Sequence, residues 1–390
     1  MSALADRLKR ARESLGLTQE AVERATGIGT SSLSEFESGK REPRLAQLRS
    51  LADCYRRPLS YFLRDEEPKA QPVLWRQRPD SPQQLEADLR NLAYQYHTLE
   101  LIVEGRAVSH LREQFESIGC CPDEFTYRMA EGLACEVRNL LNLGDAPGGR
   151  LLDILEQKLG VKVFHLEFEP TGSAACTASE EYGSAILLNA RSSRRRRNFD
   201  LAHELFHLLT WNSFRSAACD STCASDREEK LANCFARNLL IPRDSLLRVW
   251  TSTHEPYPCS PIRICYLARY FDVSIEALGW QIKWVFDLDD GQANRLIERA
   301  KSMEPILGRP ENDSPPVRPP RFERLAREAL RAGLISVGKY AEFMGIPRRQ
   351  AMEEYSRVLE ADLQDNGESD PSTTERECGT GETSWLLHVA

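Results

Sequence analysis

The chain has 390 residues, a net charge of −8 at neutral pH and 41% hydrophobic residues, which suffices for two or three domains with their own cores. No apolar run approaches the length of a membrane-spanning helix, and the N-terminus lacks the apolar core of a signal peptide. We therefore expect a cytoplasmic protein without membrane contact. The 11 cysteines are odd in number and scattered, which favours reduced thiols over a disulfide framework.

Charge is distributed unevenly along the chain. Residues 1–63 contain eleven Lys and Arg against eight Asp and Glu, a balance of 11 − 8 = +3, while the remainder is acidic. A basic N-terminal head on an acidic body favours a head that contacts nucleic acid.

The head is predicted to fold into five short helices. Apolar spacing places them at residues 4–15, 19–26, 30–38, 45–52 and 59–63. Gly16 and Gly27 end the first two helices, and Thr18 is the expected N-cap of the second. Two short helices joined by a tight turn are the arrangement that places the second helix in a DNA major groove.

Three motifs of the head, Leu17-Thr-Gln-Glu-Ala21, Ser34-Glu-Phe-Glu-Ser-Gly39 and Lys40-Arg-Glu-Pro43, closely resemble the Xre/Cro-type helix-turn-helix family. The resemblance implies that a homodimer binds a double-stranded DNA operator. The DNA-binding residues that it implies are Gln19, Thr30, Ser31 and Ser34 near the DNA and Lys40 and Arg41 near phosphates. Glu35 departs from the pattern, because related domains often carry a basic or amide residue there. The alternative is a helix-turn-helix retained only for dimerisation.

Residues 65–84 contain four prolines and are predicted to form a linker. Trp75, between Leu74 and Arg76, predicts that part of this linker docks on a neighbouring surface. A long helix is expected from Leu85 onward as a connector, a dimer seam or core packing within one chain. Further helices are predicted near residues 130–141 and 150–159, and strands at residues 161–164 and 184–189.

The segment from Phe199 to Thr210 carries the strongest chemical signal. It contains His203, Glu204 and His207 in the order His-Glu-x-x-His, and its apolar residues recur at helical spacing. Two histidines four positions apart share one helix face, so both imidazoles can bind one metal ion. Glu204 is offset by one position and can reach a metal-bound water. The alternative is a core helix that carries two histidines by chance.

A catalytic zinc needs three protein ligands and one open position. Glu229 is the best candidate for the third ligand, since it begins an amphipathic run that Pro242 stops. Glu228 is the competing candidate. Two facing helices would thus supply two histidines and one glutamate.

The Arg197-Asn-Phe199 segment, the Leu201–His207 segment and the Glu229–Pro242 segment together resemble the ImmA/IrrE-type metallopeptidases over approximately residues 130 to 250. The resemblance implies Zn²⁺ bound by His203, His207 and Glu229, with Glu204 as catalytic base. Members of that family act in stress or mobile-element regulation by cleaving a helix-turn-helix repressor. In zinc peptidases a strand beside the metal commonly binds extended substrate by edge pairing, and we expect Ser184–Asn189 in that role.

Several other features have simpler expectations. The run Arg194–Arg197 is predicted to be a solvated loop in which Arg197 makes one structural contact. Cys219 and Cys223 are expected to be ordinary free thiols, with oxidant sensing or a second metal as alternatives. Cys176 is a further candidate for metal binding. A thiolate is a strong zinc ligand, and this one would silence the site by occupying the open zinc position.

Beyond the peptidase motif, residues 262–278 are predicted to form a helix, a turn and a helix that close the peptidase core. Residues 313–320 read as a second proline-rich linker, and residues 322–360 as a helical module. The tail from residue 365 is polar and predicted to be disordered.

These observations predict a mostly α protein with a small α+β zincin-like peptidase domain and an N-terminal all-α helix-turn-helix domain. The expected divisions are a DNA-binding domain (1–64), a linker (65–84), connecting helices (85–129), a peptidase domain (130–290), a helical module (291–364) and a tail (365–390). We expect a DNA-binding regulator with zinc metalloendopeptidase activity that cleaves itself or a repressor in a stress response. The alternatives are a non-catalytic ligand- or redox-sensing regulator and an antitoxin-like protein.

Overall fold

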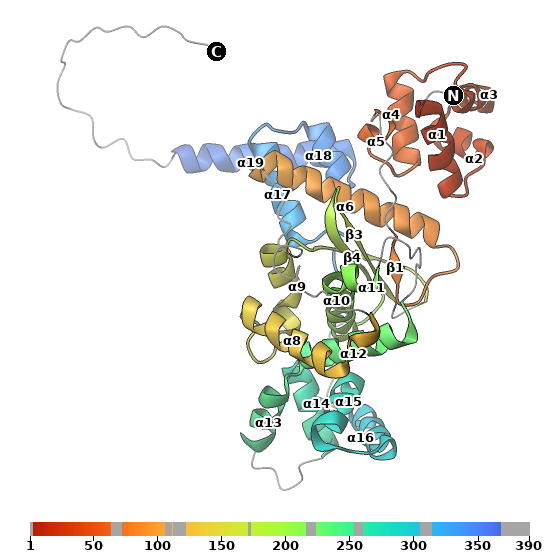
Figure 1. The fold of residues 1–390 in the computed structure, drawn as a ribbon. Helices are drawn as coiled ribbons and strands as arrows, with labels where there is room; N and C mark the ends of the chain where they lie inside the picture. Colours follow the sequence, from red (N-terminus) through yellow and green to blue (C-terminus); the bar gives the residue numbers. More distant parts are fainter. Residues whose placement is uncertain are drawn as a thin grey trace, which may run out of the picture. The chain divides into compact units, whose positions relative to one another are not determined.

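A computed structural model of the chain describes residues 3–63, 72–105, 111, 122–170, 173–215, 224–252, 260–304 and 314–367. The chain divides into two compact units, residues 1–325 and 326–390. Figure 1 labels helices and strands of the chain. Cys219, Cys223 and most of the predicted disordered tail lie outside the described residues. Within the described part, no helix is long and apolar enough to cross a bilayer.

The predicted fold class is confirmed, since helices predominate and one small sheet is present. The head contains all five expected helices: α1 (Ala3–Ser14), α2 (Gln19–Thr26), α3 (Thr30–Ser38), α4 (Leu45–Cys54) and α5 (Leu59–Leu63). Thr18 caps α2 by accepting a hydrogen bond from the Ala21 amide, and Gly27 ends the helix at φ 72°. Val22, Leu33 and Phe36 are buried in the small core of the head.

The sheet has four strands in the order β1-β3-β4-β2. Their bounds are β1 (Leu74–Trp75), β2 (Lys162–Leu166), β3 (Ala174–Ser179) and β4 (Gly183–Asn189). β2 and β4 pair in parallel, whereas β3 is antiparallel to both β4 and β1. β4 is therefore an internal strand, and the expectation that Ser184–Asn189 pairs with substrate is wrong. Both of its edges are already bonded, so it has no free backbone groups to offer.

Beyond the head, the described part of the first unit contains further helices. They are α6 (Pro82–Glu104), α8 (Tyr127–Leu141), α9 (Leu151–Ile154), α10 (Arg194–Leu209), α11 (Trp211–Phe214), α12 (Asp226–Leu240), α13 (Arg243–Ser252), α14 (Pro261–Tyr270), α15 (Ile275–Phe286) and α16 (Asp290–Met303). Short helical turns lie at Pro122–Glu124 and Gly148–Arg150, and a π-helical turn at Leu155–Leu159 continues α9. The helix, turn and helix expected at residues 262–278 are α14, α15 and the turn between them. Apolar residues of both helices join the main core.

Alternate residues of the strands face opposite layers of helices. Ala174, Cys176 and Ala178 of β3 belong to the core cluster that includes the buried side of α10. On the other face, Phe164 of β2 packs edge-to-face on Tyr96 of α6. The sheet is thus buried on both sides, and the metal-motif helix lies directly on one of them.

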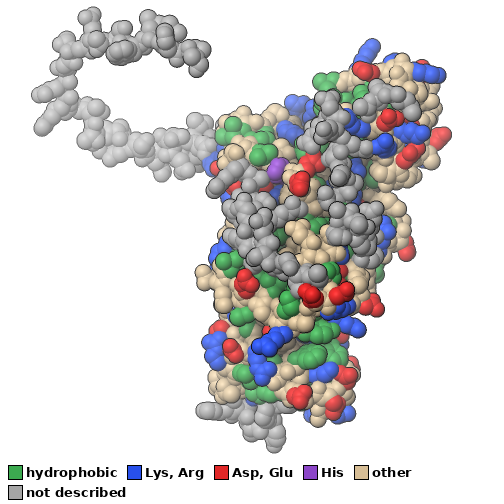
Figure 2. Space-filling view, in the orientation of Figure 1, with side chains coloured by type: hydrophobic (Ala, Val, Ile, Leu, Met, Phe, Trp, Pro, Cys, Tyr) green, Lys and Arg blue, Asp and Glu red, His purple; other side chains and the backbone are tan. Residues whose placement is uncertain are grey.

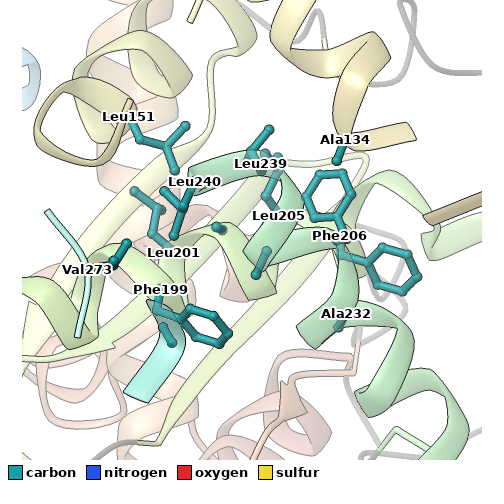
Figure 3. Close-up of a cluster of buried hydrophobic side chains, with 14 of the residues drawn as sticks. Ala134, Leu151, Phe199, Leu201, Leu205, Phe206, Ala232, Leu239, Leu240 and Val273 are labelled. Carbon is teal, nitrogen blue, oxygen red and sulfur yellow. The ribbon is translucent and has the colours of Figure 1, made fainter. Parts of the chain in front are cut away.

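The main core lies where α10 and α12 meet. Leu201, Leu205 and Phe206 of α10 pack near Leu239 and Leu240 of α12 (Figure 3). Full burial of one such side chain contributes on the order of 2 kcal/mol. This packing fixes the two helices that carry the metal motif.

The C-terminal unit begins within α17 (Pro320–Arg331) and continues through α18 (Val337–Met344) and α19 (Arg348–Gly367). The Tyr340 hydroxyl donates a hydrogen bond to Glu354 Oε2 at 2.8 Å, which ties α18 to α19. The helical character predicted for this module is confirmed. α19 extends through residue 367 and so includes the first residues of the predicted tail.

Candidate metal centre and helix-turn-helix face

The helix α10 begins earlier than its apolar pattern predicts. Ser193 caps it by accepting a hydrogen bond from the Arg196 amide, so Arg194–Arg197 form its first turn. The prediction of a solvated loop is wrong because arginine is a good helix former and carboxylates lie within reach of the run. Asp272, for example, lies 2.5 Å from Arg194, and Asp200 lies 3.0 Å from Arg196.

Three predicted ligand residues converge on one point. His203 and His207 lie one turn apart on α10, and Glu229 lies near the start of α12. The two Nε2 atoms are 3.2 Å apart, and Glu229 oxygens lie 3.1 Å from His203 Nε2 and 3.4 Å from His207 Nε2. Two zinc–nitrogen bonds at a tetrahedral angle place their nitrogens roughly 3.3 Å apart. The spacing of the three donor atoms therefore fits a tetrahedral zinc ion.

The outer nitrogens of both imidazoles are held by oxygen atoms. His203 Nδ1 lies 3.1 Å from Asn233 Oδ1, and His207 Nδ1 lies 2.9 Å from Glu228 Oε1. Because an amide or carboxylate oxygen accepts, each Nδ1 carries the proton and donates. In the neutral form of each imidazole, the Nε2 lone pair then faces the point of convergence, which is the tautomer that a metal ligand needs.

Glu228 is buried behind the ligand shell, which distinguishes it from Glu229. Arg215 Nη2 lies 2.7 Å from the same Glu228 oxygen that contacts His207. The structure thus places Glu229 in the group of three donors and Glu228 on the outer side of His207. Of the two candidates for third ligand, only Glu229 faces both histidines.

Glu204 is fully buried, and neither of its carboxyl oxygens makes a hydrogen bond of standard geometry with the described residues, although the weakly donating Cys176 thiol lies beside them. Burial raises the pKa of this carboxyl to about 7. A buried carboxyl without such a hydrogen bond is costly, so it indicates a group that is kept for a ligand or a reaction. The Cys176 thiol of β3 adjoins it, and burial raises the pKa of Cys176 well above its usual value. Cys176 lies outside the group of three metal-binding candidates.

The histidines differ in their electrostatics. Burial lowers the pKa of His203 to about 4. Burial also opposes charge on His207, but hydrogen bonds to Glu228 and Glu229 outweigh it and raise the pKa to about 9. Burial likewise opposes ionisation of Glu229, yet the two histidines hold the pKa of that carboxyl well below its usual range. The ionised Glu229 therefore places a negative charge beside the two Nε2 atoms, where a divalent cation would bind.

Sequence reasoning missed Arg76 as part of this site. It reaches in from the residue after β1, and its Nη1 lies 2.6 Å from Asp200 Oδ1. Its Nη2 donates at 3.2 Å to Asn233 Oδ1, the atom that also contacts His203. The Trp75 position did signal that this stretch docks on the body, and Trp75 is 1% exposed. No local pattern connected Arg76 with the histidines.

The head presents part of its predicted DNA-contacting set to solvent. Ser31, Ser34, Lys40 and Arg41 are exposed on or just after α3, while Thr30 at the start of α3 is half-buried. Gln19 is also half-buried, and its amide donates at 3.0 Å to Glu37 Oε2. The same Glu37 carboxylate binds Arg12 Nε at 2.6 Å. Gln19 is therefore tied to the frame of the head.

Glu35, the acidic residue of α3 that departs from the family pattern, forms an ion pair. Glu35 Oε2 lies 3.3 Å from Arg41 Nη1, and the Arg41 guanidinium lies 5.0 Å from the centre of the Phe36 ring. One exposed cation of the expected phosphate-binding pair is thus partly neutralised. Figure 2 shows Lys and Arg interspersed with Asp and Glu over the face that it draws, so charge of one sign is not gathered there.

Comparison with known proteins identifies two domains. Residues 8–62 match the family described as helix-turn-helix, and residues 156–283 match the peptidase family described as IrrE N-terminal-like domain. No curated protein matches the chain. Among solved structures, Bacillus thuringiensis PlcR in complex with the peptide PapR7 and DNA is matched at 11% identity over 94% of this chain and 99% of that chain. The TM-score of this match is 0.16.

The chain therefore joins an Xre-type helix-turn-helix domain to an IrrE-like peptidase domain.

Proposed function

We propose that this DNA-binding regulator holds one Zn²⁺ through His203, His207 and Glu229 and hydrolyses a peptide bond at that site. The proposal is supported by one observation above all. The donor atoms converge at tetrahedral spacing beside the buried carboxyl of Glu204, which makes no hydrogen bond of standard geometry in the described chain. A structural zinc would have no use for such a carboxyl, because its fourth position is filled by a protein ligand.

The chain's own residues have separate roles in this reaction. When bound, zinc polarises the scissile carbonyl and lowers the pKa of a bound water. Glu204 accepts the proton of the attacking water and delivers it to the leaving amine. Asn233 and Glu228 keep the imidazoles oriented through their Nδ1 atoms. His203 and Glu204 are fully buried, and electrostatic interactions are stronger in such a low-dielectric environment.

On the DNA side, we propose a cytoplasmic homodimer on a near-palindromic operator. A single small helix-turn-helix contacts only a few base pairs, and two copies on half-sites one helical turn apart provide the specificity. Ser31 and Ser34 of α3 would face the bases, and Lys40 and Arg41 the phosphates. The proposed scissile target is an extended, exposed segment of this chain or of a related repressor, cleaved in a stress response.

The test uses Glu204→Gln in the full-length chain. Glutamine keeps the size and an accepting oxygen but cannot take up a proton, so the variant should keep zinc and DNA binding while hydrolysis falls by at least a hundredfold. The matched control is Glu136→Gln, at an exposed position of α8. Cells in which the Glu204 variant regulates normally, with no fragment under any inducing condition, would overturn the enzymatic proposal in favour of a sensor.

A further inference from the structure

The sheet edge nearest the metal centre is occupied by the chain itself. β3 lies between β4 and β1, and β1 pairs with it in the register Leu74 opposite Cys176 and Trp75 opposite Ala175. Beyond the two-residue strand, the Arg76 amide donates to the Ala174 carbonyl at 3.1 Å. An antiparallel strand added to an exposed edge is the way in which many proteins bind extended peptides.

Side chains of β3 and its neighbouring loop extend this pairing in both directions. The Thr177 hydroxyl donates to the Pro72 carbonyl at 3.0 Å. The Ser173 hydroxyl donates to the Gln77 carbonyl at 2.5 Å. Main-chain groups from residue 72 to residue 77 thus accept or donate hydrogen bonds along β3 and the residue before it. Only Leu74 and Trp75 of this segment form the strand β1. Main-chain recognition of this kind tolerates different sequences in the same place.

The pairing brings this segment to the proposed catalytic base. Directly opposed residues of an antiparallel pair project to the same face. Leu74 therefore projects to the α10 face beside Cys176, and Cys176 adjoins the Glu204 carboxyl. Two residues on, Arg76 projects to the same face and contacts Asp200 and Asn233. Between them, Trp75 turns to the opposite face, where its Nε1 donates to Glu86 at 3.1 Å.

From this arrangement we infer that the β3 edge is a peptide-docking surface and that residues 72–77 are its resident occupant, excluding other peptides from the metal centre. The inference rests on the proposed function. The peptide that fits has an apolar residue opposite Cys176, then an aromatic residue, then an arginine that Asp200 and Asn233 bind. Asp200 retains Arg196 as a partner at 3.0 Å when that arginine leaves, so the acceptor site persists.

The occupant is hard to displace for two reasons. Val73, Leu74 and Trp75 are at most 2% exposed, so release exposes three apolar side chains. It is also part of the same chain, which gives it an effective concentration that a separate peptide matches only at roughly millimolar levels.

The experiment measures peptide binding without hydrolysis. A fluorescein-labelled peptide with the sequence of residues 72–78 (Pro-Val-Leu-Trp-Arg-Gln-Arg) is titrated into the full-length Glu204→Gln chain and followed by anisotropy. Trp75→Ala loosens the occupant from the face away from the metal centre and should tighten peptide binding at least tenfold. The control is Phe164→Ala, which removes a buried aromatic ring from β2 at the other edge and should leave binding at the parent level.

Two further measurements show where the peptide binds and whether its first arginine contributes to affinity. Hydrogen exchange should show that the added peptide slows the amides of residues 174–179 in the Trp75→Ala variant. A peptide with alanine in place of its first arginine should bind at least tenfold more weakly. Equal binding by parent and Trp75→Ala, equal gains from Trp75→Ala and Phe164→Ala, or protection elsewhere would overturn the inference.

If Trp75→Ala does not fold, a cross-linked variant tests whether residues 72–77 block peptide binding at the β3 edge. Opposed residues of an antiparallel pair have Cα atoms roughly 5 Å apart, within the span of a disulfide. Leu74→Cys, oxidised with diamide, should link to Cys176 and abolish the residual peptide binding that the reduced protein shows. The same binding in both redox states would contradict the inference. Because none of these readouts needs turnover, a chain that proves inactive can still support or refute the docking surface.

Discussion

Glu228 Oε1 lies 2.9 Å from His207 Nδ1, on the opposite side of the ring from the Nε2 atom that faces Glu229. Two consecutive residues of one helix thus contact both nitrogens of a single imidazole. Successive positions on an α-helix are rotated by about 100°, which allows one carboxylate to face the metal position while its neighbour reaches behind the ring. The two glutamates therefore have separable effects on metal affinity.

Zinc content should distinguish these glutamates. Glu229→Ala removes a ligand, and we expect the purified chain to lose its zinc on dialysis against a weak chelator. Glu228→Gln keeps a hydrogen-bond acceptor but removes the negative charge, and should weaken zinc affinity by roughly 10- to 100-fold without abolishing it. Metal analysis and competition with a chromogenic chelator provide the two values. Equal losses in both variants would contradict the assignment.

Cys176 provides a second test of the same assignment. Because its thiol adjoins Glu204 and lies outside the three-donor group, Cys176→Ala should retain about one zinc per chain, as expected for a three-ligand site. His203→Ala, measured alongside, should retain none. If the cysteine variant lost its zinc while remaining folded by circular dichroism, the thiolate would have to be a ligand.

DNA binding should depend on salt and on the turn after α3. Phosphate contacts release counterions, so the affinity of an operator duplex should fall steeply between 50 and 200 mM salt, by roughly 10³-fold for six contacts. Lys40→Ala combined with Arg41→Ala should reduce the slope of log affinity against log salt by about 2 per head. Lys9→Ala, an exposed cation on α1, is the control. An unchanged slope in the double variant would count against this docking.

Stability should depend on pH through Glu156. This residue is 2% exposed, and burial raises its pKa to about 8. A carboxyl with a raised folded-state pKa stabilises the fold below its unfolded pKa, and that contribution is lost as pH rises through the folded pKa. Between pH 5 and 8, the stability of the parent relative to Glu156→Gln should fall by up to about 1.4 kcal/mol per pH unit.

Urea unfolding at several pH values, followed by tryptophan fluorescence, measures that difference. Glu167→Gln is the matched control, since the Glu167 side chain is 68% exposed. A stability difference that does not change with pH would show that Glu156 ionises normally in the folded chain.

The helices of the head and the metal motif were predictable because their signals are local. The spacing of His203 and His207 fixes their common face, and Thr18 and Gly27 mark the ends of α2 at the observed positions. The choice between Glu228 and Glu229 was not settled by spacing. It depends on how α12 is rotated against α10, which is a tertiary property.

The sheet was harder to predict. β3 has the sequence Ala-Ala-Cys-Thr-Ala-Ser, in which only Thr177 is β-branched, so propensity gives little indication of a strand. It becomes a strand because partners bind both of its edges. Gly183, at φ 81° immediately after a short polar turn, was the available sign of a hairpin into β4. Because the sequence gives little sign of β3, it favours Ser184–Asn189 as the substrate strand, and that segment is the internal strand β4.

The pairing of β1 with β3 also bears on how the chain folds. Leu74 and Cys176 are 176 − 74 = 102 positions apart, so this contact closes a long loop for very few backbone hydrogen bonds. Loop closure must be offset before such a contact stabilises anything. We therefore expect β1 to join the sheet after β2, β3 and β4 have assembled. By the same reasoning it should be the first strand to open in native-state exchange. The newly made protein would then pass through a stage in which its metal site is built but still uncovered.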